Sequence, residues 1–273
     1  MKGVRTLSFI WNRRIATASL VLVGAGMTSA AIVAPEGHRT VAAAAAVVPF
    51  AVDTVTPSES PVTLASRVTE ALLALQGFVK EQSHPEALAS AVRSYLAFQQ
   101  ARPDDVKKPY LYYVDFGLPG STPRGYVFDM KDLSLVDGPF TVAHGRGSAP
   151  SGNVVPSRFS NVNGSEATSL GLYVAQELYD FSGKASGRRY TSPGLRLTGV
   201  SGSFNDEARE RGVVVHGAPY VTAKGAGRSE GCPAVEPARA EKLLPMLSNG
   251  ALVFLFAPKS DWLASDPWVS AAG

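Results

Sequence analysis

Cys232 is the only cysteine in this chain of 273 residues. A disulfide needs two cysteines, and zinc fingers and iron–sulfur clusters need several, so all of these are excluded within the chain. Charged residues are also few, at 18%, whereas hydrophobic residues make up 45%. This composition is too apolar for an intrinsically disordered protein. The sequence therefore predicts a globular protein with one large domain and room for a small accessory piece.

The formal net charge of +3 comes from the N-terminus. Residues 1–34 contain four basic side chains and no acidic one, which leaves 22 basic and 23 acidic side chains, a net of −1, for the rest. No phosphate-binding glycine motif follows a predicted strand, and no basic stripe is interleaved with aromatic residues. We therefore expect neither a nucleotide cofactor nor a nucleic-acid partner.

The N-terminus has the layout of an export signal. A basic start is followed by an uncharged run over residues 16–34 (ATASLVLVGAGMTSAAIVA), with small residues after it at 42–46. We expect residues 1–46 to direct the body to the periplasm or cell envelope. The run is long for a signal, so an uncleaved membrane anchor over residues 15–34 is the alternative. Residues 47–60, rich in Pro, Ser and Thr, predict a linker.

Beyond the linker the hydrophobic pattern is first helical and then, from about residue 108, typical of β-strands. Steps of three and four residues predict helices over 61–79 and 85–100, and so a helical hairpin extension over 61–107. From residue 108 to 258 short β-rich segments predict a mainly β domain, a β-sandwich or a partly closed barrel, with one late helix over 237–247. Residues 259–273 are expected to form a C-terminal tail. The expected strands are 110–116, 124–130, 140–143, 170–175, 195–197, 213–215 and 251–256.

One pattern in this domain carries chemistry. A strand ends at His216, and a glycine-rich loop brings Cys232 sixteen residues later. A thiol needs a base or a positive neighbour to become a nucleophile at neutral pH, and imidazole is the usual choice. Gly231 suits a tight turn that directs its own N–H and that of Cys232 at a reacting carbonyl, as an oxyanion hole does. The structural alternatives are a buried inert thiol and a histidine bonded to backbone.

These residues also carry a family resemblance. His216-Gly217 and Ser229-x-Gly231-Cys232 resemble the active-site signature of L,D-transpeptidases with the YkuD-type fold. The segments HGAPYV (216–221) and GRSEGCPAV (227–235) are similar to the murein L,D-transpeptidase catalytic-domain branch of that family. The resemblance covers about residues 108–258, where shorter segments also fit that branch: 114–116, 142–146, 159–161, 169–171, 195–197 and 204–206.

The resemblance implies a YkuD-like fold and a specific reaction. Cys232 would attack a peptidoglycan donor tetrapeptide before its terminal D-Ala, and His216 would act as general base and then acid. The Gly217 carbonyl would fix the imidazole tautomer, and the Gly231 and Cys232 N–H groups would bind the oxyanion. The acyl-thioester would pass to an amine acceptor stem. Neither a metal nor an organic cofactor is implied. We expect Sγ to lie within ~4 Å of a ring nitrogen.

Further residues are candidates for substrate binding: Arg228, Ser229, His144 and Arg146. For Ser229 the alternative is that it stabilises the loop, and for His144 that it bonds to backbone at a strand end. The sequence departs from the family pattern at Glu230, which we expect to point outward with Arg228 offsetting its charge, and at residues 233–235 (PAV), where many members have an Arg or Asn. Residues 209–211 (RER) are expected to form a solvated turn.

Three alternatives to a transpeptidase stay open. The same site would make an L,D-carboxypeptidase or endopeptidase if water were the acceptor. Glu230 raises the alternative of an inactive wall-binding protein. A zinc site of His144, His216 and Cys232 is the rival chemistry, although no short ligand pair such as HxxxH supports it. For the oligomeric state we take a monomer as the default.

Overall fold

The computed structural model describes residues 63–271, and these belong to one compact unit. The predicted export signal, the alternative anchor and the linker lie outside the described residues. Within residues 63–271 no helix has the length and apolar character needed to cross a membrane.

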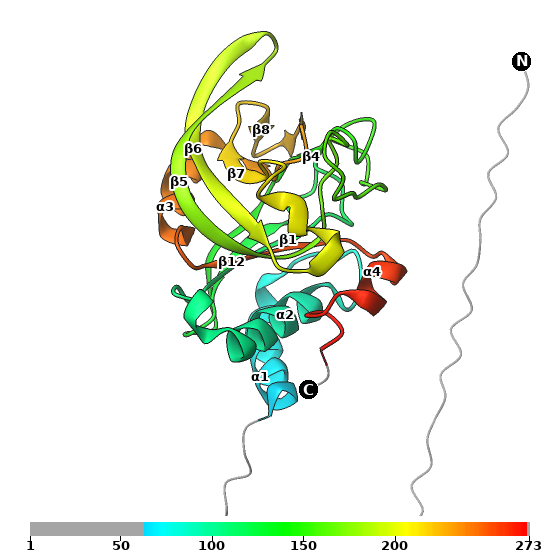
Figure 1. The fold of residues 1–273 in the computed structure, drawn as a ribbon, viewed down its shortest axis with the longest axis vertical. Coiled ribbons are helices and arrows are strands. Elements are labelled where there is room, and N and C mark those ends of the chain that lie inside the picture. The colour runs from blue at the N-terminus through cyan, green and yellow to red at the C-terminus, as the bar shows by residue number, and fades with distance from the viewer. Residues whose placement is uncertain (1–62, 272–273) are drawn as a thin grey trace, which may run out of the picture. The chain divides into compact units, whose positions relative to one another are not determined.

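One large mixed sheet forms the centre of the fold (Figure 1). Its eight strands run in the order β11-β7-β6-β5-β12-β1-β2-β3. The β1–β12 and β7–β11 pairs are parallel, and the other neighbours in the sheet are antiparallel. The bounds are β1 Tyr110–Asp115, β2 Gly125–Asp129, β3 Ser134–Phe140, β5 Gly171–Ala185, β6 Arg188–Gly199, β7 Val214–Gly217, β11 Ala234–Val235 and β12 Leu252–Phe256.

Smaller elements complete the fold. Two-stranded pairs are formed by β4 (His144–Gly145) with β10 (Arg228–Ser229) and by β8 (Val221–Thr222) with β9 (Gly225–Ala226). The α-helices are α1 Leu64–Leu75, α2 Ala87–Ala101, α3 Pro237–Leu247 and α4 Ser260–Ser265. Single 3₁₀ turns cover Gln76–Phe78, Pro103–Asp105, Gly202–Phe204 and Asp206–Ala208.

The sheet is covered on both faces, which explains its long apolar strands. In β12, Leu252, Phe254 and Phe256 belong to one hydrophobic cluster with α1, α2 and Trp262 of α4. Val253 and Leu255 point to the opposite face and join a second cluster with α3. A strand buried on both faces reads as a continuous apolar run rather than as an alternating one. Figure 1 shows α1, α2 and α4 on one side of the sheet and α3 on the other.

The mainly β prediction with N-terminal helices is confirmed. Of the two architectures expected, the structure has the partly closed barrel, because the eight strands form one curled sheet rather than two stacked ones. The late helix occupies its predicted residues, Pro237–Leu247. Residues 259–271, expected as a tail, instead contain α4 and bury Trp262, whose Nε1–H donates to the buried Asp266 at 2.9 Å.

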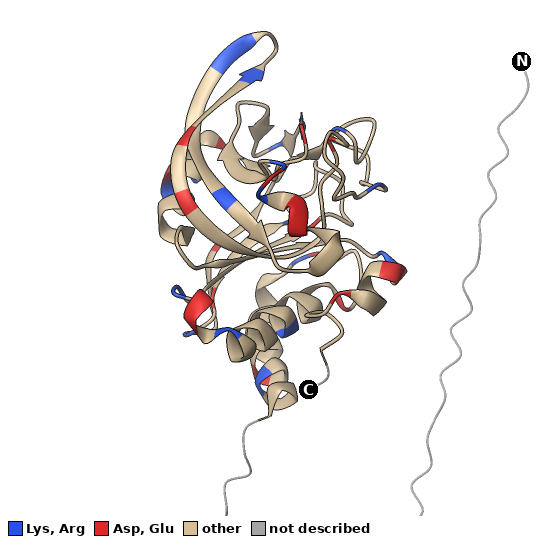
Figure 2. Cartoon of the chain, viewed as in Figure 1, with Lys and Arg blue, Asp and Glu red and all other residues tan. Residues whose placement is uncertain are grey.

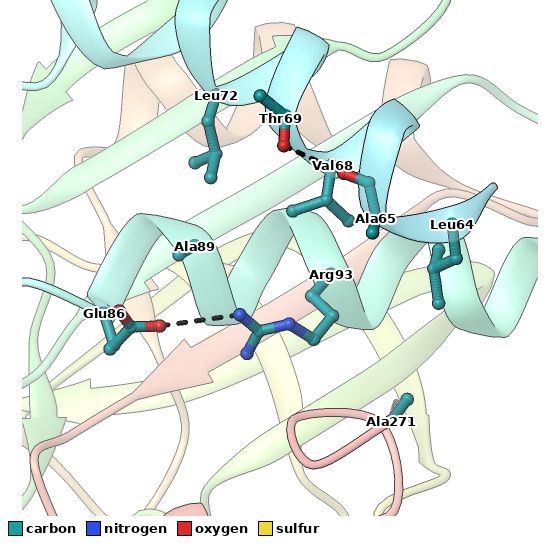
Figure 3. A pocket seen from close by; sticks show the side chains of 9 residues that line it. All are labelled: Leu64, Ala65, Val68, Thr69, Leu72, Glu86, Ala89, Arg93 and Ala271. Carbon is teal, nitrogen blue, oxygen red and sulfur yellow. Dashed lines mark hydrogen bonds and ion pairs between the residues drawn. The ribbon is translucent and has the colours of Figure 1, made fainter. Parts of the chain in front are cut away.

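A groove of about 380 Å³ lies between α1, α2 and the C-terminal segment (Figure 3). Leu64, Val68 and Leu72 of α1 face it, and Glu86 and Arg93 form an ion pair along α2 on its other wall at 3.5 Å. Its lining offers no cysteine and no histidine. The chemistry predicted from the sequence therefore has to lie elsewhere.

Candidate active site

The parallel pairing of β7 and β11 brings the two predicted catalytic residues together. His216 lies opposite Ala234 in the register, and its backbone N–H donates to the Pro233 carbonyl at 3.4 Å. Cys232 precedes β11 by two residues and so lies beside the start of β7. Both side chains line one cavity of about 520 Å³ below the β5–β6 hairpin.

The imidazole of His216 is held as a neutral base. Its Nδ1 lies 3.0 Å from the Gly217 carbonyl, and because a carbonyl only accepts, Nδ1 carries the proton. The lone pair is therefore on Nε2. Burial lowers the pKa of His216 to about 4, and the hydrogen bond with Gly217 acts in the opposite direction and raises it. At neutral pH the ring is uncharged and able to accept a proton.

An aromatic side chain of the hairpin covers this ring. Phe181 of β5 stacks on His216 with ring centroids 4.1 Å apart and an interplanar angle of 21°. Tyr190 of β6 lies farther off, at 6.4 Å. The stacked ring keeps water from the imidazole, and this desolvation disfavours the imidazolium form.

Replacing Phe181 with Ala should therefore raise the pKa of His216 towards its ordinary value of about 6.5. More of the imidazole is then protonated in mild acid, and a protonated ring cannot act as a base. We expect the acylation rate of the variant to be roughly tenfold lower at pH 5 than at pH 8, whereas the acylation rate of the wild type changes little over that range. The measurement is the pH dependence of the acylation rate. Phe181→Leu, which keeps an apolar cover, is the control, and an unmoved acid limb in Phe181→Ala would contradict the argument.

The thiol of Cys232 is partly exposed in the same cavity. Its Sγ donates to the Gly212 carbonyl at 3.8 Å, and among the described residues no hydrogen bond joins it to the His216 ring. Burial raises the pKa of the thiol, the Arg211 guanidinium lowers it and the Glu230 carboxylate raises it. The sulfur is thus protonated at neutral pH and needs a base when it attacks. The expected Sγ–imidazole contact stays a prediction.

The turn before Cys232 is built around Ser229. The Gly231 N–H donates to Ser229 Oγ at 3.2 Å, and Ser229 Oγ donates to the Cys232 carbonyl at 2.5 Å. Gly231 has φ +124°, a conformation that favours glycine. The sequence suggested two oxyanion donors, but here the Gly231 amide is bonded inside the turn, which leaves the Cys232 N–H. Ser229, named as a substrate contact, is also held within the loop.

The charges around the turn differ from expectation. The Glu230 side chain is 78% exposed, as an outward carboxylate should be. The cation near it is Arg146, whose Nη2 lies 3.7 Å from Glu230 Oε1, and not Arg228, which donates to the Ala149 carbonyl at 2.9 Å. Arg146 also pairs with Glu166, through Nε at 2.5 Å and through Nη2. A substrate carboxylate would have to compete with Glu166 for this guanidinium.

His144, expected among the substrate contacts, belongs instead to the core. Its side chain is fully buried and absent from the cavity lining, and its Nδ1 lies 2.9 Å from Nη2 of the equally buried Arg124. Burial and the Arg124 charge lower the pKa of His144 to about 3. The ring is therefore neutral and accepts from the guanidinium. Residues 63–271 contain no cluster of three metal-ligating side chains, so they offer no support for the zinc alternative.

Arg211 is one of several cavity residues that sequence reasoning missed, and its environment differs most from the expected one. Residues 209–211 were expected to be solvated, and Arg209 does pair with the exposed Glu177. Arg211 is instead half-buried in the cavity wall and has no carboxylate within ion-pair distance among the described residues. Its sequence context, Arg209-Glu210-Arg211, gives no sign of this. Its guanidinium donates to neutral oxygens only: Ser160 O, Ser169 Oγ, Ser165 Oγ and Ala167 O.

The fold and the site together define a mainly β domain in which a thiol and a neutral imidazole share one cavity, the arrangement that acyl transfer through a cysteine requires. The chain belongs to the L,D-transpeptidase catalytic domain family, whose model matches residues 79–256. That match begins before the predicted domain start at residue 108 and includes α2.

Solved structures of L,D-transpeptidases are similar to parts of this chain. One from Mycobacterium smegmatis is 18% identical with a TM-score of 0.35, and the match covers 55% of this chain and 59% of that one. One from Stackebrandtia nassauensis is 17% identical with a TM-score of 0.34, covering 70% and 80%. One from Mycobacterium tuberculosis H37Rv is 17% identical with a TM-score of 0.32, covering 54% and 57%. No curated protein sequence matches the chain.

Proposed function

We propose that this chain is an exported, cysteine-dependent L,D-transpeptidase that acts on the stem peptides of peptidoglycan. The observation that carries the proposal is the shared cavity of His216 and Cys232 in a member of this family. The signal-like composition of residues 1–34 supports export to the cell envelope.

The reaction follows from the protonation states. Cys232 Sγ attacks the carbonyl that joins the third stem residue to the terminal D-Ala, and its proton passes to Nε2 of His216. The C–N bond then breaks as the imidazolium returns that proton to the departing D-Ala amine, leaving a thioester. An amine of a second stem attacks the thioester and loses a proton to Nε2. The thiolate leaves, takes up that proton, and a 3→3 cross-link has formed.

The charge of the cavity suits such a substrate. One acidic side chain, Glu230, lies in its lining, against five basic ones, and stem peptides carry free carboxylates. Figure 2 shows basic residues near the tip of the β5–β6 hairpin. A cleft lined by charges of one sign attracts ligands of the other. The five are Arg146, Lys184, Arg189, Arg211 and Arg228.

The reaction products distinguish a transpeptidase from a hydrolase and from an inactive wall-binding protein. Purified protein is incubated with a disaccharide-tetrapeptide, and the products are read by mass. We expect 3→3 linked dimers together with free D-Ala. Tripeptide and D-Ala without dimers would identify a hydrolase instead, and unchanged tetrapeptide would indicate an inactive wall-binding protein. A donor whose side-chain amine is acetylated is the matched control, because it can form the thioester but cannot act as acceptor.

A further inference from the structure

Of the four backbone polar groups of Gly231 and Cys232 in the catalytic turn, three are hydrogen-bonded and one is free within residues 63–271. Among the described residues, Gly231 N–H and the Cys232 carbonyl both bond to Ser229 Oγ, and the Gly231 carbonyl accepts from Thr168 Oγ1 at 3.1 Å. The Cys232 N–H has no such partner. This donor belongs to the same residue as the thiol and is therefore available for a reacting oxygen.

Thr168 controls where that donor points. Its hydroxyl accepts from the Gly145 N–H at 3.0 Å, so its own proton goes to the Gly231 carbonyl. That carbonyl and the Cys232 N–H belong to one trans peptide unit, in which the two bonds point in opposite directions. Fixing the carbonyl against Thr168 therefore fixes the N–H on the side away from Thr168.

The threonine is itself rigidly placed. Its side chain and backbone are buried, its N–H donates to Ser148 Oγ at 3.0 Å, and its carbonyl accepts from the Ser160 N–H at 3.1 Å. The contact across the turn is also close, because a Cβ added to Gly145 would lie 2.8 Å from the Gly231 Cα. The hydroxyl thus bridges two backbones that are packed directly against each other.

We propose that Thr168 is a positioning residue that orients the Cys232 N–H as the oxyanion donor of this site. The inference rests on the proposed function, since an oxyanion forms only if Cys232 is acylated. Thr168 contacts neither the reacting atoms nor the cavity; it acts through the Gly231–Cys232 peptide.

Two reactions of the same thiol test the proposal. Acylation by a carbapenem passes through a tetrahedral oxyanion, whereas alkylation by iodoacetamide does not. Thr168→Val keeps the shape of the side chain and removes its hydroxyl. Loss of a whole oxyanion donor costs about 10²–10³-fold, and for a misoriented one we expect acylation to slow by roughly 10- to 100-fold. Alkylation at matched pH should stay within about twofold of wild type, and Thr168→Ser should restore acylation.

Controls separate this role from a general loss of structure. Thr141 is equally buried and donates its hydroxyl to the Thr222 carbonyl, outside the turn, so Thr141→Val should acylate as the wild type does. Acylation of Thr168→Val at the wild-type rate would overturn the inference, as would equal slowing of acylation and alkylation. A wild type that alkylates but never acylates would instead overturn the proposed function, and this inference with it.

Discussion

Replacing Cys232 with Ala is expected to abolish both acyl-enzyme formation and the formation of cross-linked product. No other cysteine exists in the chain, so no second thiol can substitute. Loss of a covalent nucleophile typically removes most of the chemical rate, and we expect a fall of roughly 10⁴-fold or more. Intact-mass spectrometry after exposure to a carbapenem measures the adduct, and muropeptide analysis measures turnover.

The folded state should survive this change. The Cys232 side chain is partly exposed, and its hydrogen bond with the Gly212 carbonyl is a long one, at 3.8 Å. We expect the melting temperature to change little, which separates lost chemistry from lost structure. Cys232→Ser is the matched variant, since it keeps the size of the side chain with a much weaker nucleophile. Cross-linked products from Cys232→Ala would rule out the thioester mechanism and leave the fold assignment intact.

The parts of the fold predicted best were those with a strong local pattern. The apolar run of β12 and the proline-initiated helix α3 appear where expected. Each can be recognised from its own residues, β12 as a short continuous apolar run and α3 from the helical spacing of its buried leucines. The β5–β6 hairpin was predicted far too short. Its residues 176–193 extend beyond the neighbouring strands β12 and β7 and are largely polar. They are held by cross-strand pairing between β5 and β6, which no single segment reveals. β3 was mostly missed because Gly138 and Pro139 resemble a turn; as an edge strand it tolerates the proline.

The site divides in the same way. His216 and Cys232, which line one cavity, could be proposed from the sequence because a thiol with an imidazole base requires few residue types and a recognisable spacing. The burial of His144 could not be foreseen, since its partner Arg124 lies 20 residues away, just before β2. The same holds for Arg211 and Thr168, whose contacts come from a loop remote in sequence. Local pattern identifies reactive groups, whereas the groups that position them are defined by tertiary contacts.

Removing the base should have the second large effect. His216→Gln replaces the imidazole with an amide of similar reach, which cannot take the thiol proton. General base catalysis typically contributes ~10²–10⁴-fold. We therefore expect acylation at pH 7 to fall by about that factor. The loss should shrink as the pH rises, because hydroxide then forms the thiolate without a base. The raised pKa of Cys232 places this recovery in the alkaline range.

The pH profile distinguishes a base from a merely structural histidine. The wild type has a neutral imidazole at every pH well above about 4, so its acylation rate should be nearly flat from pH 6 to 8. In His216→Gln the rate should instead rise about tenfold per pH unit below the thiol pKa, since only the thiolate reacts. His84→Gln, in the connection between α1 and α2 and absent from the cavity lining, should keep the wild-type profile. A uniformly slow but flat profile in His216→Gln would mean that the ring supports the site by packing alone, and that the proton of Cys232 leaves by another route.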